Sequence, residues 1–131
     1  MVEVDRIRTI PLFEGLTEDE LATVAAWIEP RTVETGRVVV PEGESGYTFF
    51  LLERGEVAVD QDGAEVARLG PGDFFGEMAI LGKGKRVATV TATTETTVLS
   101  IFGLEFRRLE AELPAVAERI RAAADAREAA L

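Results

Sequence analysis

The chain has 131 residues and a formal net charge of −10, from 14 basic and 24 acidic side chains. It contains no cysteine and no histidine, which excludes disulfides, thiolate nucleophiles and zinc–thiolate sites, and removes the commonest general base at neutral pH. A field of this sign repels nucleic-acid backbones, and no run approaches the roughly 18 apolar residues of a membrane span. We therefore expect no nucleic-acid partner, no membrane span, no metal and, by default, a cytoplasmic location.

Hydrophobic residues make up 47% of the chain, enough for a real core. The sequence shows no internal repeat, low-complexity linker or second domain. We expect one domain over residues 1–131, with a helical part at 1–30, a β part at 31–102 and C-terminal helices at 103–131.

The first clear element is a helix that begins at Thr17. Thr17 and Glu20 have the spacing of a capping box, in which each side chain bonds the backbone N–H of the other's position. An apolar stripe follows at helical spacing, and Pro30 marks its predicted end. The pattern is that of an ordinary amphipathic helix packed on the domain.

Between residues 31 and 102 the sequence favours short β-strands punctuated by glycines. The expected strands are Thr32–Val33, Val38–Val40, Tyr47–Leu52, Glu56–Val59, Glu65–Leu69 and Val87–Ile101. The Asp62-Gly63 pair is a strong signal for a hairpin turn. Strands at this spacing predict a mainly β protein with flanking helices, an antiparallel β-barrel or jelly roll.

After Gly103 the sequence is helical again. Leu104 to Leu113 form one expected helix, and Pro114 suits the first turn of the next. That last helix carries a narrow, alanine-rich apolar stripe that includes Val116 and Ile120. The stripe is consistent with a helix that covers a site or pairs with a partner, and equally with a solvated amphipathic tail.

The segment from Phe74 to Thr89 has the features of an anion site. Gly76 lets a ligand approach the backbone closely, and a short helix after it would present free N–H groups. Arg86 offers a planar fork of donors suited to a phosphate diester. With Lys83 and Lys85, it gives a local reversal of sign in an acidic chain. The acid at Glu77 is unexplained by a phosphate alone.

Several motifs in fixed order resemble the cyclic nucleotide-binding domain family. In sequence they are Gly36, Glu42-Gly43, Phe49 to Leu52, Gly55 to Val59, Gly72 to Glu77 and Arg86 to Val90. The resemblance covers the chain from about residue 10 to about residue 124. It implies the family's double-stranded β-helix, with a short phosphate-binding helix inside the segment 74–89.

The resemblance also implies roles for individual residues. Arg86 would hold the phosphate of a cyclic nucleotide, and Glu77 would accept from the ribose 2′-hydroxyl. The expected ligand-binding residues are Gly76, Glu77, Met78, Ala79, Arg86, Val87 and Ala88. Those expected to line the ribose and base cavity are Val59, Val66 and Leu69. The lid over the base would come from the C-terminal helix, through Ile120, Arg121 or Arg127.

Two positions depart from the family's usual pattern. Lys85 stands where many members have proline, and Val87 stands where many have alanine or serine. Members selective for cyclic GMP tend to carry threonine at the position of Val87, and valine lacks that hydroxyl. Cyclic AMP is therefore the favoured ligand and cyclic GMP the less favoured one, with no cofactor.

Three alternatives remain open at this stage. Glu77 and Arg86 could form a simple salt bridge, and Val59, Val66 and Leu69 could be plain core. A second function is a ligand-free interaction module of the same fold, which would form a homodimer through the last helix or bind an effector protein. An enzyme of the cupin type is the weakest class, because those barrels usually hold a metal through histidines.

The family's transcription factors carry a helix-turn-helix after the last barrel helix, and this sequence shows none. We expect a non-catalytic regulatory or sensor domain in signal transduction. It would either stand alone or form part of something larger.

Overall fold

The computed structural model describes the backbone of residues 1–40, 48–77 and 88–130, and all of their side chains except those of 102–106 and 128–130. The described helices are η1 (Val4–Arg6), η2 (Pro11–Phe13), α1 (Glu18–Ala25), α2 (Gly103–Glu112) and α3 (Pro114–Ala130). The described strands are β1 (Glu29–Val33), β2 (Val38–Val40), β3 (Thr48–Arg54), β4 (Val57–Gln61), β5 (Ala64–Leu69), β6 (Phe74–Phe75), β7 (Thr89–Ala92) and β8 (Thr96–Phe102).

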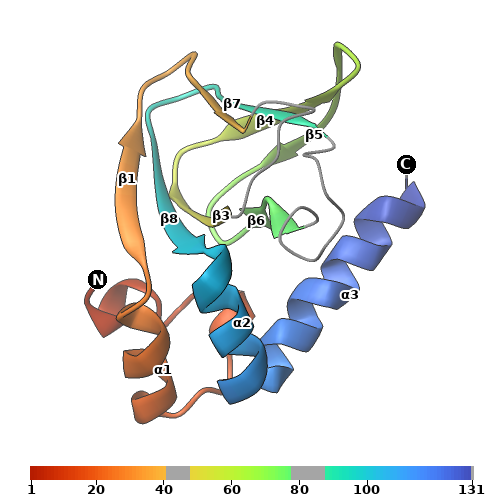
Figure 1. The fold of residues 1–131 in the computed structure, drawn as a ribbon. Coiled ribbons are helices and arrows are strands. Elements are labelled where there is room, and N and C mark those ends of the chain that lie inside the picture. The colour runs from red at the N-terminus through yellow and green to blue at the C-terminus, as the bar shows by residue number, and fades with distance from the viewer. Residues whose placement is uncertain (41–47, 78–87, 131) are drawn as a thin grey trace.

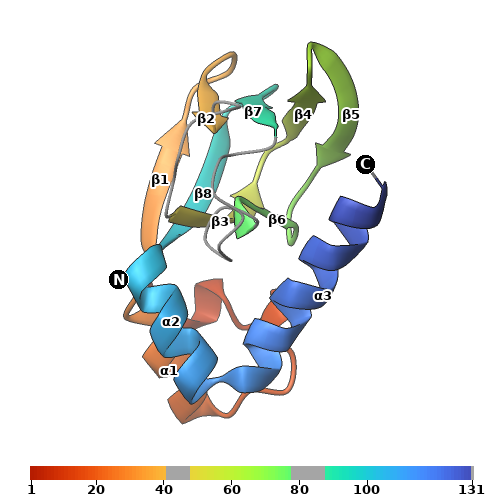
Figure 2. The ribbon, with the colours of Figure 1, turned by 45° about the vertical axis from the view of Figure 1, so that its right-hand side comes forward.

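The strands form two antiparallel four-stranded sheets. One sheet has the order β1-β8-β3-β6 and the other the order β2-β7-β4-β5. The helices gather at one end of the sheets, and α3 runs from that end up past β6 (Figures 1 and 2). The prediction of a jelly-roll fold with flanking helices is therefore confirmed.

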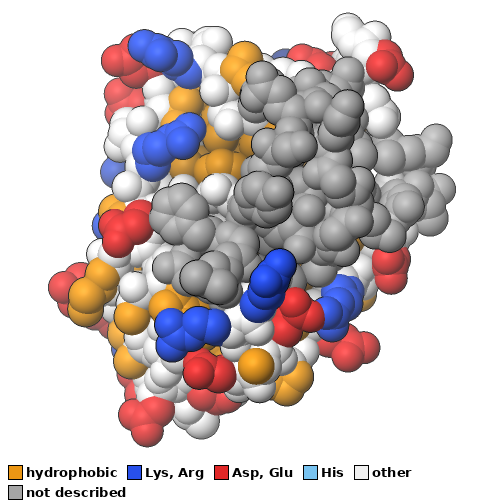
Figure 3. Space-filling view, viewed as in Figure 1, with side chains coloured by type: hydrophobic (Ala, Val, Ile, Leu, Met, Phe, Trp, Pro, Cys, Tyr) orange, Lys and Arg blue, Asp and Glu red, His pale blue; other side chains and the backbone are white. Residues whose placement is uncertain are grey.

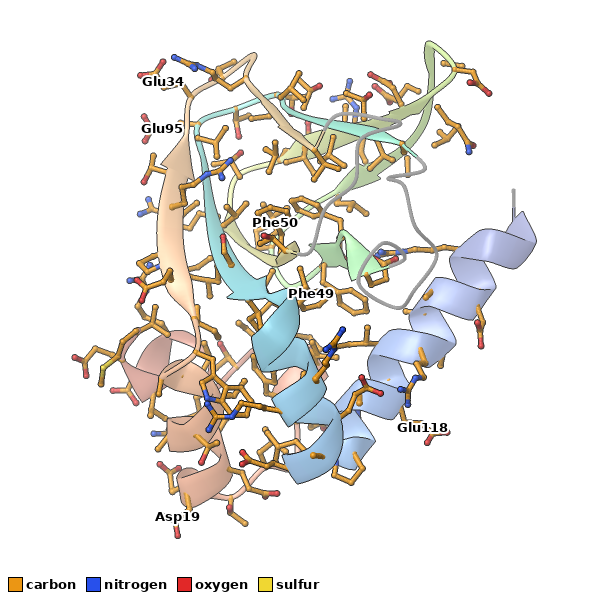
Figure 4. All side chains as sticks on the ribbon, in the orientation of Figure 1. Asp19, Glu34, Phe49, Phe50, Glu95 and Glu118 are labelled. Carbon is orange, nitrogen blue, oxygen red and sulfur yellow. The ribbon has the colours of Figure 1, made fainter. Side chains whose placement is uncertain are left out.

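Strands β3 and β8 contribute buried residues on both faces of their sheet. Along β3, Phe49 and Leu51 pack into a helix-side cluster with α1, α2 and α3, whereas Phe50 and Leu52 pack into a cluster between the sheets. Figure 4 shows Phe49 and Phe50 on opposite sides of the strand. Because side chains alternate along a strand, a run of four consecutive apolar residues supplies both clusters.

The N-terminal helix starts as predicted and ends earlier than predicted. The Thr17 hydroxyl accepts from the Glu20 N–H at 3.1 Å, and the Glu20 carboxylate accepts from the Thr17 N–H at 2.9 Å. However, α1 ends at Ala25, and Pro30 lies inside β1. A proline fits there because β1 is an edge strand paired only with β8, so its missing N–H breaks no second ladder.

The predicted hairpin joins β4 to β5. Asp62 and Gly63 have φ angles of 52° and 83°, the left-handed pair that a tight type I′ turn requires. The single strand expected over 87–101 is instead two described strands, β7 and β8, joined by a turn at residues 93–95. Val87 itself lies outside the described residues.

Hydroxyl groups of that turn tie it to Glu56. The Thr93 hydroxyl donates to the Glu56 Oε1 at 2.7 Å, and the Glu56 N–H donates to the Thr94 hydroxyl at 3.0 Å. The Thr93 hydrogen bond, together with the Arg68 guanidinium, holds the pKa of the Glu56 carboxyl below its usual value. Hydrogen bonding to the charged form favours that form, so Glu56 stays ionised at this corner.

The C-terminal helices pack against the helix-side cluster. Pro114 opens α3 as predicted, and the apolar stripe of this helix, which includes Val116 and Ile120, is buried in the cluster. The Arg119 Nη1 donates to the backbone carbonyls of Leu12 and Glu14, both at 2.9 Å. This residue fixes the middle of α3 to the end of η2.

Acidic and basic side chains are interspersed around the face shown in Figure 3. Elsewhere, charged side chains form pairs, as Arg6 does with both oxygens of Glu53 at 2.9 and 2.7 Å. Within the part of the chain that the structure describes, no helix has the length and apolar character needed to cross a bilayer.

Candidate functional site

The site is built at the end of β6, the shortest of the described strands. Gly76 follows the strand with a φ of 86°, a conformation that favours glycine because it has no Cβ. Glu77 comes next in a helical conformation and is only 3% exposed. The sequence therefore places a carboxylate in a buried position directly after a glycine turn.

The buried Glu77 is paired with the last helix. The Arg127 Nη1 donates to the Glu77 Oε1 at 2.6 Å, and the two side chains are 35% and 4% exposed, respectively. The Arg127 guanidinium also lies over the Phe74 ring, 5.0 Å from its centroid. A buried carboxylate is costly without a partner, and the ion pair with Arg127 supplies one for Glu77.

The two rings of β6 belong to different clusters. Phe74 packs against the helix-side cluster, and its ring centroid is 5.3 Å from that of Phe49. Phe75 belongs to the cluster between the sheets and stacks on Phe50, with 5.1 Å between the two ring centroids. The strand therefore separates a helix side from a barrel side, immediately before Glu77.

The expected cavity residues lie on β4 and β5. Val59 and Leu69 are half-buried and pack against the cluster between the sheets. Val66 is 52% exposed, and the pairing of β4 with β5 slips by one residue there, so that Val66 is an extra residue opposite the step from Val59 to Asp60. Such bulges re-aim side chains next to binding sites, and strict alternation does not apply to Val66. Val59 and Leu69 are thus brought together, and Val66 is more open.

The expected phosphate-binding residues fall mostly outside the described part of the chain. Met78, Ala79, Arg86 and Val87 lie there, as do Lys83 and Lys85. Ala88 is described and half-buried, one residue before β7. The alternative of a salt bridge between Glu77 and Arg86 stays a prediction, because Arg86 is one of the residues outside that part. Among the described residues, Arg127 pairs with Glu77.

The three expected lid residues of α3 have different contacts among the described residues. Ile120 is fully buried in the helix-side cluster. Arg121 pairs with Glu110 of α2. Arg127 contacts Glu77 and Phe74, and it does so as an ion-pair partner.

Two features of the site were not predicted from the sequence. Phe74 supports the Arg127 guanidinium, and Arg119 fixes α3 to the carbonyls of Leu12 and Glu14. The alternation of Phe74 and Phe75 along the strand was a signal that Phe74 faces the helices. No local pattern predicts the contacts of Arg119, because its partners are more than 100 residues away in the sequence.

This arrangement can accept a hydrogen bond in a place shielded from bulk water. An ionised carboxylate accepts through about four lone-pair sites, and one guanidinium nitrogen uses one of them. Across residues 1–40, 48–77 and 88–130, no three acidic side chains are grouped so that they could hold a metal ion. A carboxylate in this position can accept a hydrogen bond from a donor such as a hydroxyl group.

Comparison with known proteins agrees with this geometry. The sequence pattern of the family described as "Cyclic nucleotide-binding domain" matches residues 30–112. A cyclic nucleotide-gated potassium channel of Rhizobium etli is 37% identical over 115 residues, which cover 88% of this chain and 32% of that channel. The cyclic AMP receptor protein of Thermus thermophilus is 34% identical over 117 residues, or 86% of this chain and 54% of that protein.

Solved structures share the fold as well. The Thermus thermophilus catabolite activator protein superposes with a TM-score of 0.80 and 33% identity, over 91% of this chain and 59% of that one. The cAMP-bound PfPKA-R superposes with a TM-score of 0.79 and 28% identity, over 86% of this chain and 39% of that one. This chain thus spans about a third to three-fifths of these proteins. The matched pattern, the jelly roll and the buried acid after β6 show that the chain belongs to the cyclic nucleotide-binding domain family.

Proposed function

We propose that the chain is a non-catalytic sensor domain that binds a cyclic nucleotide, with cyclic AMP as the preferred ligand. The observation that carries the proposal is the burial of Glu77 at the end of β6, in a chain whose sequence has Arg86 nine residues later. A buried carboxylate and an arginine that binds phosphate would together suit a ligand that carries a hydroxyl next to a phosphate.

In this proposal the two charged residues have separate tasks. Arg86 holds the cyclic phosphate as a charge-assisted, bidentate pair, helped by backbone N–H groups near Gly76, Met78, Ala79, Val87 and Ala88. Glu77 accepts from the ribose 2′-hydroxyl. Val59, Leu69 and the more open Val66 line the ribose and base, and α3 closes the site. The cAMP-bound relative supports cyclic AMP, as does the lack of a hydroxyl on Val87.

Calorimetric titration of the purified chain with cyclic AMP and cyclic GMP tests the proposal. We expect one site per chain and tighter binding of cyclic AMP. Arg86→Ala should weaken binding by about 2–5 kcal/mol, because it leaves the phosphate without its charged partner.

Arg54→Ala is the matched control, since Arg54 is an exposed arginine at the end of β3 and its loss changes the net charge equally. It should bind as the wild type does. No heat with either nucleotide at high micromolar concentration would refute the proposal.

The second candidate is an interaction module of the same fold that has lost its ligand. The observation in its favour is Val87, whose side chain is bulkier than the alanine or serine of many relatives and would crowd a phosphate. Light scattering with and without cyclic AMP distinguishes the two candidates. A dimer that is unaffected by nucleotide, together with no heat in the titration, supports the module.

A further inference from the structure

The elbow between α2 and α3 is a break in the backbone hydrogen-bond ladder. Helix α2 ends at Glu112, α3 begins at Pro114, and Leu113 joins the two. Proline has no N–H, so it cannot donate to the carbonyl four residues earlier, which is that of Glu110. A proline also disfavours helical geometry in the residue before it, here Leu113. The angle between the two helices must therefore be fixed by other contacts.

Leu113 makes backbone contacts on both sides of the elbow. Its N–H donates to the Leu109 carbonyl at 2.7 Å, and its carbonyl accepts from the N–H groups of Val116 and Ala117 at 3.1 and 3.2 Å. Leu109, Leu113 and Val116 are buried in the helix-side cluster. Because these contacts lie close to the pivot, they have a short lever arm against a change in the angle.

A charged pair spans the same break. Arg121 of α3 pairs with Glu110 of α2, and the two side chains are 53% and 32% exposed, respectively. Glu110 is thus the residue whose carbonyl loses a backbone donor at Pro114 and whose side chain makes a contact across the break. A pair with this exposure adds little to global stability, but this one acts where the backbone ladder is interrupted.

The angle at the elbow determines where the far end of α3 lies. Helix α2 follows β8 directly, and α3 runs from the elbow past β6 (Figures 1 and 2). The 17 residues of α3 span about 25 Å, so a small change in the angle moves the far end by several ångströms. The elbow therefore links the barrel, through α2, to the position of α3 beside it.

We propose that the pair between Glu110 and Arg121 is an ionic lock on this elbow, which fixes the angle between α2 and α3 and makes the two helices move as one lever. The inference goes beyond the proposed function, because it concerns the geometry of the chain itself and its test needs no nucleotide. A change at the start of α2 would then be carried to the far end of α3.

A distance measurement between the barrel and the far end of α3 tests the lock. Because the chain has no cysteine, Ala64→Cys on β5 and Ala126→Cys on α3 provide two exposed sites for spin labels. Pulsed electron paramagnetic resonance should give one narrow distance distribution for this labelled parent. Residue 126 lies about 18 Å along α3, so a change of about 20° at the elbow would move it by about 6 Å.

Charge reversal at either member of the pair should release the elbow. Glu110→Arg and Arg121→Glu each place like charges across the break, and each should shift or broaden the distribution by about 5 Å. The double variant exchanges the two charges and should recover the parent distribution. Glu112→Arg and Arg107→Glu are the matched controls, because both residues are exposed on α2 and the net charge changes equally. Both controls should keep the parent distribution.

The double variant also covers the case in which a single variant unfolds. Circular dichroism detects such a loss, and the exchanged pair should then recover both the fold and the narrow distribution. If either single variant keeps the parent distribution, or if the double variant does not recover it, the lock is overturned. Neither result bears on the proposed function, which the cyclic AMP titration tests separately.

Discussion

At the scale of single residues, Gly55 shows how the backbone limits the choice of side chain. It lies between β3 and β4 with a φ of 90°, and a Cβ added there would be 2.5 Å from the Glu95 carbonyl oxygen and 2.6 Å from the Thr96 hydroxyl. Gly36 has almost the same φ, 87°, but an added Cβ would meet nothing within 4 Å. A side chain at Gly36 would therefore cause backbone strain alone, whereas one at Gly55 would cause both strain and steric overlap.

We predict that Gly55→Ala is much more destabilising than Gly36→Ala. Gly36→Ala should lower the free energy of unfolding by about 1–2 kcal/mol, because alanine is strained in the left-handed backbone conformation. Gly55→Ala has the same strain and also overlaps a backbone atom, so its total loss should be about 2–5 kcal/mol. Urea unfolding of both variants measures the difference. Equal losses of unfolding free energy would show that the turn at 93–95 yields to the new methyl group.

At the scale of elements, α1 depends on its first turn. The helix has only eight residues, and isolated helices of that length are marginal in water. Its capping box satisfies two backbone N–H groups, and three acidic residues in its first turn favour the positive end of the helix dipole. The buried residues Leu21 and Val24 then fix it to the helix-side cluster.

Thr17→Ala should therefore lower the free energy of unfolding by about 1 kcal/mol, the usual value of a lost N-cap. Thr17→Ser keeps an oxygen in the same place and serves as the control, with a stability close to that of the wild type. Urea unfolding followed by circular dichroism gives both values. A Thr17→Ser variant as unstable as Thr17→Ala would show that the methyl group and not the hydroxyl matters.

At the scale of the whole molecule, one sheet connects the two clusters. Leu51 and Leu52 are adjacent and fully buried, yet Leu51 packs with the helices and Leu52 packs between the sheets. Trp27, the single tryptophan of the chain, lies in the helix-side cluster. Because β3 contributes residues to both clusters, we expect the two clusters to unfold together.

We predict that Leu51→Ala and Leu52→Ala each lower the free energy of unfolding by about 2–5 kcal/mol, as expected for cavities in a core. Both variants should keep a single transition that coincides when followed by Trp27 fluorescence and by circular dichroism. A Leu52→Ala variant whose fluorescence transition is unchanged while its circular dichroism transition shifts would contradict a single cooperative unit.

Much of the fold could be predicted from the sequence because its signals are local. The capping box at Thr17 and Glu20, the Asp62-Gly63 turn and the helix start at Pro114 each depend on neighbouring residues, and all three are confirmed. The predicted end of the first helix at Pro30 was wrong, because the pairing of β1 with β8 overrides the local pattern. At the site, the resemblance predicts Glu77, but the sequence does not show that Glu77 is buried or that Arg127 is its partner, because that contact joins distant parts of the chain.

By itself, the sequence determined the jelly-roll class and the family, since both depend on the order and spacing of residues along the chain. Only the tertiary structure decided what the last helix does at this site. It buries Ile120, pairs Arg121 with Glu110 and brings Arg127 to Glu77. The physical reason is that a pair 50 residues apart exists only once β6 and α3 have packed against the same cluster, and no local pattern contains that distance.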